Sequence, residues 1–242
     1  MSTATLSSPG ARRHPLWGFI LSSMGKKLLV AVTGALLAAF LIGHLLGNLS
    51  IFLGQDAINT YAQKLRELGE LLWIARISLL LAVFVHIWAV ICLTLENRKA
   101  RPIGYAVKAH RQATVFARTM RVTGLVIAAF VVFHLAHFTW QIVNPQYRDL
   151  HDAMGRHDVY SMVILGFQNP LVSGFYLLAL GLLAFHLSHG IASMFQTLGW
   201  STQQTRPAYE FVARIFAWAL FAGFASIPLS VLGNLLQLPA HP

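Results

Sequence analysis

Long runs of apolar residues divide the chain into five segments, separated by stretches in which polar and charged residues gather. About twenty apolar residues in a helix cross a hydrocarbon core of roughly 30 Å, and each run reaches that length. Because backbone groups cannot stay unpaired in lipid, such runs predict helices and not barrel strands. The five predicted transmembrane segments cover residues 27–53, 72–95, 122–143, 171–198 and 211–236.

The composition agrees with this pattern. Hydrophobic residues make up 56% of the chain and charged residues only 11%, which does not fit a soluble domain of 242 residues. We therefore expect an all-α membrane protein with a single domain over residues 1–242, a five-helix bundle preceded by a tail at residues 1–26. The first residues hold no apolar core followed by a small-residue cleavage site, so no removable signal peptide is predicted.

The basic residues predict the orientation of the chain in the membrane. The N-terminal tail and the loops after the second and fourth segments hold thirteen of the 18 lysines and arginines. Because such loops face the cytoplasm, we expect a protein of the inner (cytoplasmic) membrane with a cytoplasmic N-terminus and an external C-terminus. The net charge of +10 lies at membrane edges without a soluble domain to present it, which favours anionic lipid, a cofactor's carboxylates or an acidic partner over nucleic acid.

Histidines inside the apolar segments are the most informative feature. Without a partner, an imidazole in hydrocarbon costs several kcal/mol, and it has two ring nitrogens to satisfy. One such histidine is usually explained by a hydrogen bond between helices, whereas recurrence on four helices favours a shared function. The histidines concerned lie on four segments, two of which carry a second one a turn further on: His44, His86, His134 with His137, and His186 with His189.

Depth in the membrane separates these histidines into two pairs. With the predicted orientation, His44 lies roughly 25 Å and His134 about 20 Å from the cytoplasmic edge, at 1.5 Å rise per residue. His86, on a segment that runs inward, lies about 15 Å from that edge, and His186, on another such segment, lies at a comparable distance from it. Depth therefore pairs His44 with His134 in the outer half of the membrane, and His86 with His186 in the inner half.

Two imidazoles at one depth on different helices suit a b-type haem held from both faces. Zinc or non-haem iron would favour carboxylate ligands, and no Asp or Glu lies within any predicted segment. The pattern therefore predicts two b-type haems stacked across the membrane. Small residues near the histidines would open the required slots between helices: Gly34, Gly43, Gly47, Gly124, Gly181 and Gly190.

Over most of residues 24–236 the chain resembles the di-haem cytochrome b membrane anchor of succinate:quinone oxidoreductases, the single-chain, five-helix anchor of succinate dehydrogenases and fumarate reductases. The glycine of a Thr-Gly step stands ten residues before a histidine on the first segment and again on the third. Further matching stretches surround the fourth segment. The residues that carry the resemblance are Thr33-Gly34, Arg121 to Gly124, Asn169-Pro170, Phe175-Tyr176, Phe185 to Gly190, Ser193 and Gly199-Trp200.

The resemblance implies which histidines bind iron. It selects His134 over His137 and His186 over His189, which gives His44, His86, His134 and His186 as the four iron ligands. His137 and His189 are then left to contact a haem edge, a propionate or quinone, or to form a hydrogen bond between helices.

The resemblance also implies partners and a place in respiratory complex II and the tricarboxylic acid cycle. Such an anchor docks a flavoprotein subunit with covalent FAD and an iron–sulfur subunit on the cytoplasmic side, and it carries electrons from succinate to membrane quinone. This chain has one cysteine and no flavin motif, so it cannot oxidise succinate alone. The direction of the reaction, the quinone (menaquinone is expected) and a higher oligomer of the complex stay open.

Residues outside the apolar segments give candidates for the quinone and for the haem propionates. Residues 56–71 form an amphipathic stretch in which Glu67, with Glu70 as the alternative, is the candidate quinone-site carboxylate. On the outer side, Arg148 and Arg156 are candidates to pair with propionates, near a predicted short interfacial helix within residues 144–169. Five residues on the inner side compete for the same role and are not ranked: Lys99, Arg101, His110, Arg111 and Arg118.

Two other functional classes remain open. A di-haem anchor of another respiratory enzyme, such as the five-helix subunit of nitrate reductase, also carries histidines in apolar helices, but its spacings and loop charges should place the N-terminus outside. A haem-free transporter would use the histidines as proton relays, and it should contain in-membrane carboxylates or broken helices. Neither feature is found in this sequence.

Overall fold

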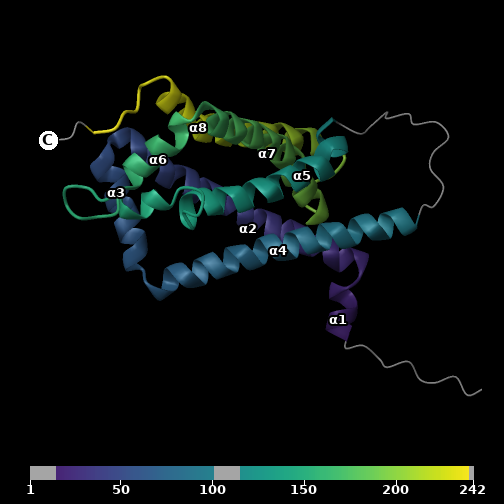
Figure 1. Cartoon of the computed structure of the whole chain (residues 1–242). Helices are drawn as coiled ribbons and strands as arrows, with labels where there is room; N and C mark the ends of the chain where they lie inside the picture. Colours follow the sequence, from purple (N-terminus) through teal and green to yellow (C-terminus); the bar gives the residue numbers. More distant parts are fainter. Residues whose placement is uncertain (1–14, 101–114, 240–242) are drawn as a thin grey trace, which may run out of the picture.

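The computed structural model describes residues 15–100 and 115–239. The predictions that concern Arg101, His110, Arg111 and the first part of the N-terminal tail fall outside these residues. Five long helices dominate the described part, and they are joined by short helices and loops (Figure 1). The long helices are α2 (Ser23–Leu49), α4 (Glu70–Lys99), α5 (Val115–His134), α7 (Pro170–Thr197) and α8 (Arg206–Leu232).

The shorter elements lie before and between the long helices. Within residues 15–100 and 115–239 no β-strand is present, and the nearest approach to one is an isolated bridge between His151 and His157. A π-helical segment, η2, directly continues α5. The short elements are α1 (Pro15–Ile20), η1 (Ser50–Leu53), α3 (Gln55–Glu67), η2 (Leu135–Thr139), η3 (Pro145–Asp149) and α6 (Val159–Gln168).

Five helices are long and apolar enough to cross a membrane, and they correspond one to one with the five predicted segments. The prediction of an all-α, five-helix membrane bundle is confirmed. The helices α5 with η2 and α8 end at Thr139 and Leu232, whereas the predicted segments run on to residues 143 and 236. In both places the apolar sequence continues, but the backbone turns away soon after the helix, through positive φ values at Gln141 (52°) and Asn234 (56°).

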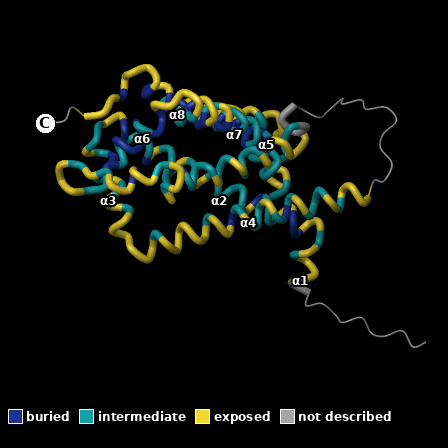
Figure 2. The backbone as a smooth tube through the Cα atoms, in the orientation of Figure 1, coloured by how far each residue is buried: buried dark blue, intermediate teal, exposed yellow. Residues whose placement is uncertain are grey.

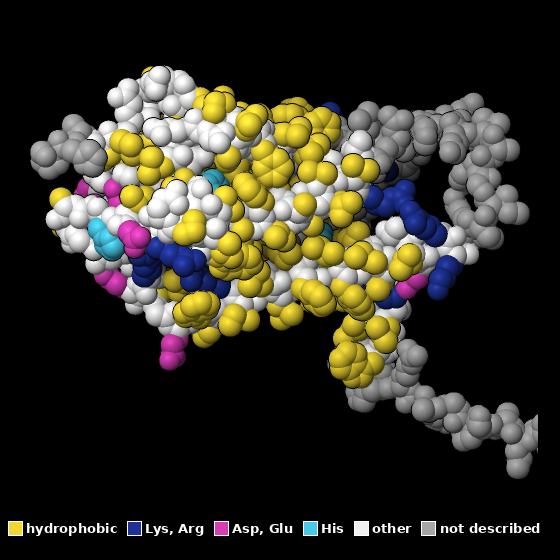
Figure 3. All heavy atoms as spheres, in the orientation of Figure 1, with side chains coloured by type: hydrophobic (Ala, Val, Ile, Leu, Met, Phe, Trp, Pro, Cys, Tyr) yellow, Lys and Arg dark blue, Asp and Glu magenta, His cyan; other side chains and the backbone are white. Residues whose placement is uncertain are grey.

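The alternation of the helices gives the bundle two different ends. We use the name basic end for the end where α2 and α5 begin and α4 finishes, marked by Lys26, Lys27, Arg98, Lys99 and Arg121. We use the name cap for the opposite end, which is built from α3, η3, the following loop and α6 (Figure 1). Between the ends, the visible face is covered by hydrophobic side chains, while charged side chains gather toward both ends (Figure 3).

Local sequence signals explain where several helices begin. The Ser22 side chain accepts a hydrogen bond from the Gly25 amide at the start of α2, and Asn169 accepts from the Leu171 amide at the start of α7. Such caps satisfy amide groups that lack a partner inside the helix. Gly54 and Gly69, with φ of 102° and 53°, allow the sharp turns on either side of α3. These turns direct the chain from α2 across the cap and back into α4.

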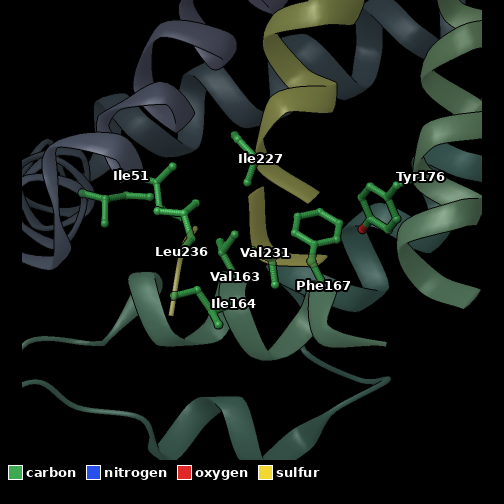
Figure 4. Close-up of a cluster of buried hydrophobic side chains, with 9 residues drawn as sticks. Ile51, Val163, Ile164, Phe167, Tyr176, Ile227, Val231 and Leu236 are labelled. Atoms are coloured by element: carbon green, nitrogen blue, oxygen red, sulfur yellow. The ribbon is translucent and has the colours of Figure 1, made fainter. Parts of the chain in front are cut away.

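The most buried part of the molecule lies at the cap, where α6 inserts among the ends of other helices (Figure 2). The predicted short interfacial helix is present as α6, but it is a core element and not a surface one. Its sequence is apolar on nearly all faces, so burial on all sides stabilises it. The cluster at this position joins η1, α3, α6, α7, α8 and the segment after α8 through Ile51, Ile58, Val163, Ile164, Phe167, Tyr176, Ile227, Val231 and Leu236 (Figure 4).

Candidate functional site

The outer pair of histidines, His44 and His134, lies near the cap. His44 on α2 and His134 at the end of α5 face each other with ring centroids 5.8 Å apart and ring planes at 85°. His44 stacks on Phe40 of its own helix, and Phe224 of α8 lies 5.8 Å away. The structure therefore brings together two imidazoles from different helices in an aromatic and apolar environment.

The inner pair, His86 and His186, lies nearer the basic end. His86 on α4 and His186 on α7 are close enough for a charge on the His86 ring to act on His186. Each ring packs against a glycine of a neighbouring helix: a Cβ atom on Gly34 would stand 3.4 Å from Cε1 of His86, and one on Gly124 would stand 3.4 Å from Cε1 of His186. The two glycines thus let the imidazoles lie close to the α2 and α5 backbones.

Threonine hydroxyls contact the Nδ1 atoms of both inner histidines. Thr33 Oγ1 lies 3.0 Å from His86 Nδ1, and Thr123 Oγ1 lies 3.4 Å from His186 Nδ1. The Thr33 hydroxyl donates to the Leu29 carbonyl at 2.6 Å, so the shared contact is one in which the imidazole Nδ1–H donates and Thr33 accepts. This arrangement leaves the Nε2 atom of the ring unprotonated, which is the form that binds a metal.

The outer histidine His134 has a different partner. The hydroxyl of Tyr176 on α7 lies 3.4 Å from Nδ1 of His134 and 3.0 Å from Nδ1 of His137. His137 is fully buried, stacks on Phe138 at 4.0 Å and sits in the π-helical segment η2. Single π-helical turns recur at functional sites. Tyr176 therefore links the predicted ligand His134 to a second, buried histidine.

His44 and His189 lack a contact with a hydroxyl of another helix among the described residues. Asn48 Nδ2 lies 3.3 Å from His44 Nδ1 and donates to the His44 carbonyl at 2.7 Å, so His44 is contacted by a polar group of its own helix. His189, one turn beyond His186, lies within electrostatic range of Glu210 and Arg206 at the start of α8. His189 therefore lies nearer the predicted membrane edge than His186 does.

The outer pair fits an iron held between two imidazoles. Metal–imidazole bonds of about 2 Å place the centres of two opposed rings roughly 6 Å apart, close to the separation of His44 and His134. Across residues 15–100 and 115–239, no protein hydrogen bond is found to Nε2 of His86, His134 or His186, whereas each Nδ1 contacts a hydroxyl. No group of three or more His, Cys, Asp or Glu side chains gathers as a metal site in the same residues. The candidate iron ligands in the described residues are therefore grouped as pairs of histidines and not as larger clusters.

The basic end contains a cavity that sequence reasoning missed. It has a volume of about 370 Å³ and is lined by Thr94, Asn97 and Arg98 of α4 and by Arg121 of α5. Arg121 stands one turn before Gly124, the residue that packs against His186. Lys26 of α2 forms an ion pair with Glu96 of α4 beside it. Of the competing inner candidates, Lys99 is an exposed residue of α4, and nothing of the Arg118 side chain is described.

The two outer arginines are already engaged in contacts within the protein. The three guanidinium nitrogens of Arg156 contact Asp152 at 2.7 Å, Asp56 at 2.9 Å and Thr60 at 2.7 Å. Arg148 donates to the Trp140 carbonyl at 2.9 Å from an exposed position. The geometry of Arg156 therefore favours a structural role in the cap over the predicted contact with a propionate.

The predicted quinone-site carboxylates lie on the exposed part of the cap. Glu67, the last residue of α3, accepts a hydrogen bond from Gln63 at 2.9 Å. Glu70 is the first residue of α4 and is also exposed. In the described part of the chain neither carboxylate contacts a histidine of the two pairs, so the structure does not bring the predicted quinone residues and the predicted ligands together.

A network of buried polar side chains in the cap was not predicted. Asn59 of α3 donates to Asp152 and to Asp158, each at 3.0 Å, and only 1% of Asn59 is exposed. Asp158 also accepts from Gln55 at 2.9 Å and from the Ser161 amide at 3.1 Å, where it caps α6. These contacts tie α3 to the loop before α6, across almost one hundred residues of sequence.

Fold and site together define an all-helical membrane protein that pairs histidines from separate transmembrane helices. The family model of the succinate dehydrogenase/fumarate reductase transmembrane subunit matches residues 94–225, more than half of the 242-residue chain. The chain belongs to this family. No curated protein and no solved structure matches it. The match spans α5, α7 and most of α8, and so includes His134 and His186.

Proposed function

We propose that this chain is the electron-transferring membrane anchor of a succinate:quinone oxidoreductase and that it holds two b-type haems. The observation that carries the proposal is the arrangement of four histidines as two pairs, each drawn from two transmembrane helices. His44 and His134 would hold the iron nearer the cap, and His86 and His186 the iron nearer the basic end. When bound, haem supplies a one-electron carrier at each of the two depths.

The residues around each pair prepare the imidazoles for this task. Thr33 and Thr123 accept from Nδ1 and so leave Nε2 as the unprotonated nitrogen that could bind iron. Gly34 and Gly124 have no side chains, so the inner rings pack directly against the backbones of α2 and α5. Phe40 and Phe224 exclude water from His44. The apolar surroundings and the fixed ring nitrogens support haem ligation more than proton relay.

The basic end is the proposed cytoplasmic side and the docking face for the flavoprotein and iron–sulfur subunits. Its support is the concentration of lysines and arginines there, while six of the eight carboxylates of the chain lie toward the cap. The proposed quinone site lies at the cap, nearer His44 and His134. Glu67 stays the proposed proton-exchanging carboxylate, with Glu70 as the second candidate, because both are exposed to solvent.

The cavity at the basic end is the proposed position of the inner haem's propionates. Arg98 and Arg121 face it from two helices, and a cation near a haem stabilises the reduced, more negative state. Arg121→Gln is therefore expected to lower the midpoint potential of the haem that depends on His186. Redox titration of the purified complex measures this, with Lys99→Gln as the matched control, since Lys99 is basic and near but does not line the cavity. An equal shift in both variants would contradict the assignment.

The function is tested by spectroscopy of the complex purified with its two partner subunits. We expect a reduced-minus-oxidised spectrum with b-type bands, two haems per chain by haem extraction, and two separate steps on redox titration. Succinate should reduce both haems, and added menaquinone should reoxidise them. A complex that reduces quinone without any b-type band would overturn the haem proposal, and one haem per chain would overturn the pairing.

A further inference from the structure

One contact between a threonine and a histidine occurs twice in the chain, in corresponding positions. Thr33-Gly34 on α2 and Thr123-Gly124 on α5 each precede a histidine of their own helix, yet both contact a histidine of another helix. The geometry agrees closely, because a Cβ atom on either glycine would stand 3.4 Å from Cε1 and 3.8 Å from Nδ1 of the contacted ring. Helices α2 and α5 thus each contact an imidazole of another helix through the same Thr-Gly pair.

The direction of the hydrogen bond follows from the other partners of each threonine. The Thr33 hydroxyl donates to Leu29, and the Thr123 hydroxyl donates to the Thr119 and Met120 carbonyls at 3.1 Å. Each hydroxyl has a single hydrogen, so its oxygen is left to accept. Both inner imidazoles therefore carry their proton on Nδ1.

In the described residues, the outer pair of histidines has no such contact with a Thr-Gly pair. His134 meets the hydroxyl of Tyr176, which it shares with His137, and His44 meets only the amide of Asn48 from its own helix. A hydrogen bond that accepts from Nδ1–H makes the imidazole a more basic ligand, which favours the oxidised, more positive iron. The inner pair has two matched acceptors on transmembrane helices, whereas the outer pair has one tyrosine hydroxyl, which His134 shares with His137.

We propose that Thr33 and Thr123 are positioning residues that fix the tautomer of His86 and His186 and set the potential of the inner haem independently of the outer haem. The inference rests on the proposed function, because it requires that these histidines bind iron. It goes further because it assigns control of one redox centre to two threonine hydroxyls on helices that do not carry the inner ligands.

The test compares Thr33→Val, Thr123→Val and the double variant with the matching serine variants in the purified complex. Valine keeps the shape of threonine but removes the acceptor, whereas serine retains it. We expect each valine variant to raise the midpoint potential of one haem, always the same one, and the double variant to raise it further. Gly34 and Gly124 still pack against the two rings in these variants, so a shift and not a loss of haem is expected. Serine should restore the potential of the unsubstituted complex.

The reciprocal variant Tyr176→Phe should change the midpoint potential of the outer haem only. It gives a second measurement if the complex with Thr123→Val does not assemble. The inference is overturned if valine leaves both potentials unchanged, moves both haems equally, or if serine behaves as valine does. The unsubstituted complex separates this failure from that of the proposed function. If it binds two b-type haems while the valine variants are unchanged, only the positioning role fails. If it binds none, both fail.

Discussion

Replacing His134 with alanine is expected to remove one haem from the complex and to leave the other in place. The ring centroids of His134 and His44 lie 5.8 Å apart, so the loss of either ring would open one side of the proposed iron site. His44→Ala should therefore remove the same spectral component as His134→Ala. His86→Ala and His186→Ala should remove the other component, because we propose that these two residues hold the second iron. Haem content and low-temperature difference spectra of the four variants measure this.

The variants also test the choice between neighbouring histidines. His189 lies one turn from His186 near Glu210 and Arg206, and His137 lies one turn from His134 with Tyr176 as its partner. If His189→Ala removes a haem and His186→Ala does not, the assignment on α7 is reversed. Loss of the same component from His44→Ala and His86→Ala would refute the pairing itself. Because the complex requires its partner subunits, each variant is first checked for co-purification with them.

The transmembrane helices could be predicted from the sequence because hydropathy reports length and apolarity, the two properties that define a membrane span. It does not report where the backbone turns. Residues 140–143 and 233–236 are largely apolar, yet they follow the ends of η2 and α8, near the positive φ values of Gln141 and Asn234. Apolar residues of this kind are buried in the cap or face lipid without being helical.

The histidine pairs were also within reach of the sequence, since depth depends only on residue count and orientation. The partners of the histidines were not. The spacing of Thr33-Gly34 in the sequence points to His44, ten residues after Gly34, whereas the Thr33 hydroxyl contacts His86 on another helix. Arg156 was predicted to pair with a propionate, but Asp56 and Asp152 already hold it. Contacts across helices and between distant loops depend on packing, and no local pattern in one sequence encodes them.

The polar network of the cap leads to the second large expected effect. Asp158→Ala should loosen α3 from α6, because Asp158 accepts from Asn59, Gln55 and the Ser161 amide from a buried position. Leaving such donors without an acceptor costs on the order of 1–3 kcal/mol. We expect a lower melting temperature and faster amide exchange over α3 and α6. Asp149→Ala is the matched control, since Asp149 is an exposed carboxylate of the same loop.

The same network predicts a dependence on pH. Burial acts to raise the pKa of Asp158, but hydrogen bonds from Ser161, Asn59 and Gln55 outweigh it and hold the pKa below its usual value. The pKa of Asp152 is likewise lowered, because hydrogen bonds from Asn59 and Arg156 outweigh the effect of burial. A carboxylate with a lowered pKa stabilises the folded state above the pKa of the unfolded chain, about 4, and that contribution is lost as the pH falls through the lower, folded value.

Amide exchange of the cap in detergent, followed from neutral to acid pH, measures this contribution. The unsubstituted protein should keep its cap protected at neutral pH and lose protection below about pH 4. Asp158→Asn should begin with weaker protection and change less over the acid range, because one of the titrating carboxylates is gone. If Asp158→Asn and the unsubstituted protein lose protection in parallel, the ionised carboxylate does not hold α3 to α6. The apolar cluster around Ile164 and Phe167 would then be what fixes α6 in place.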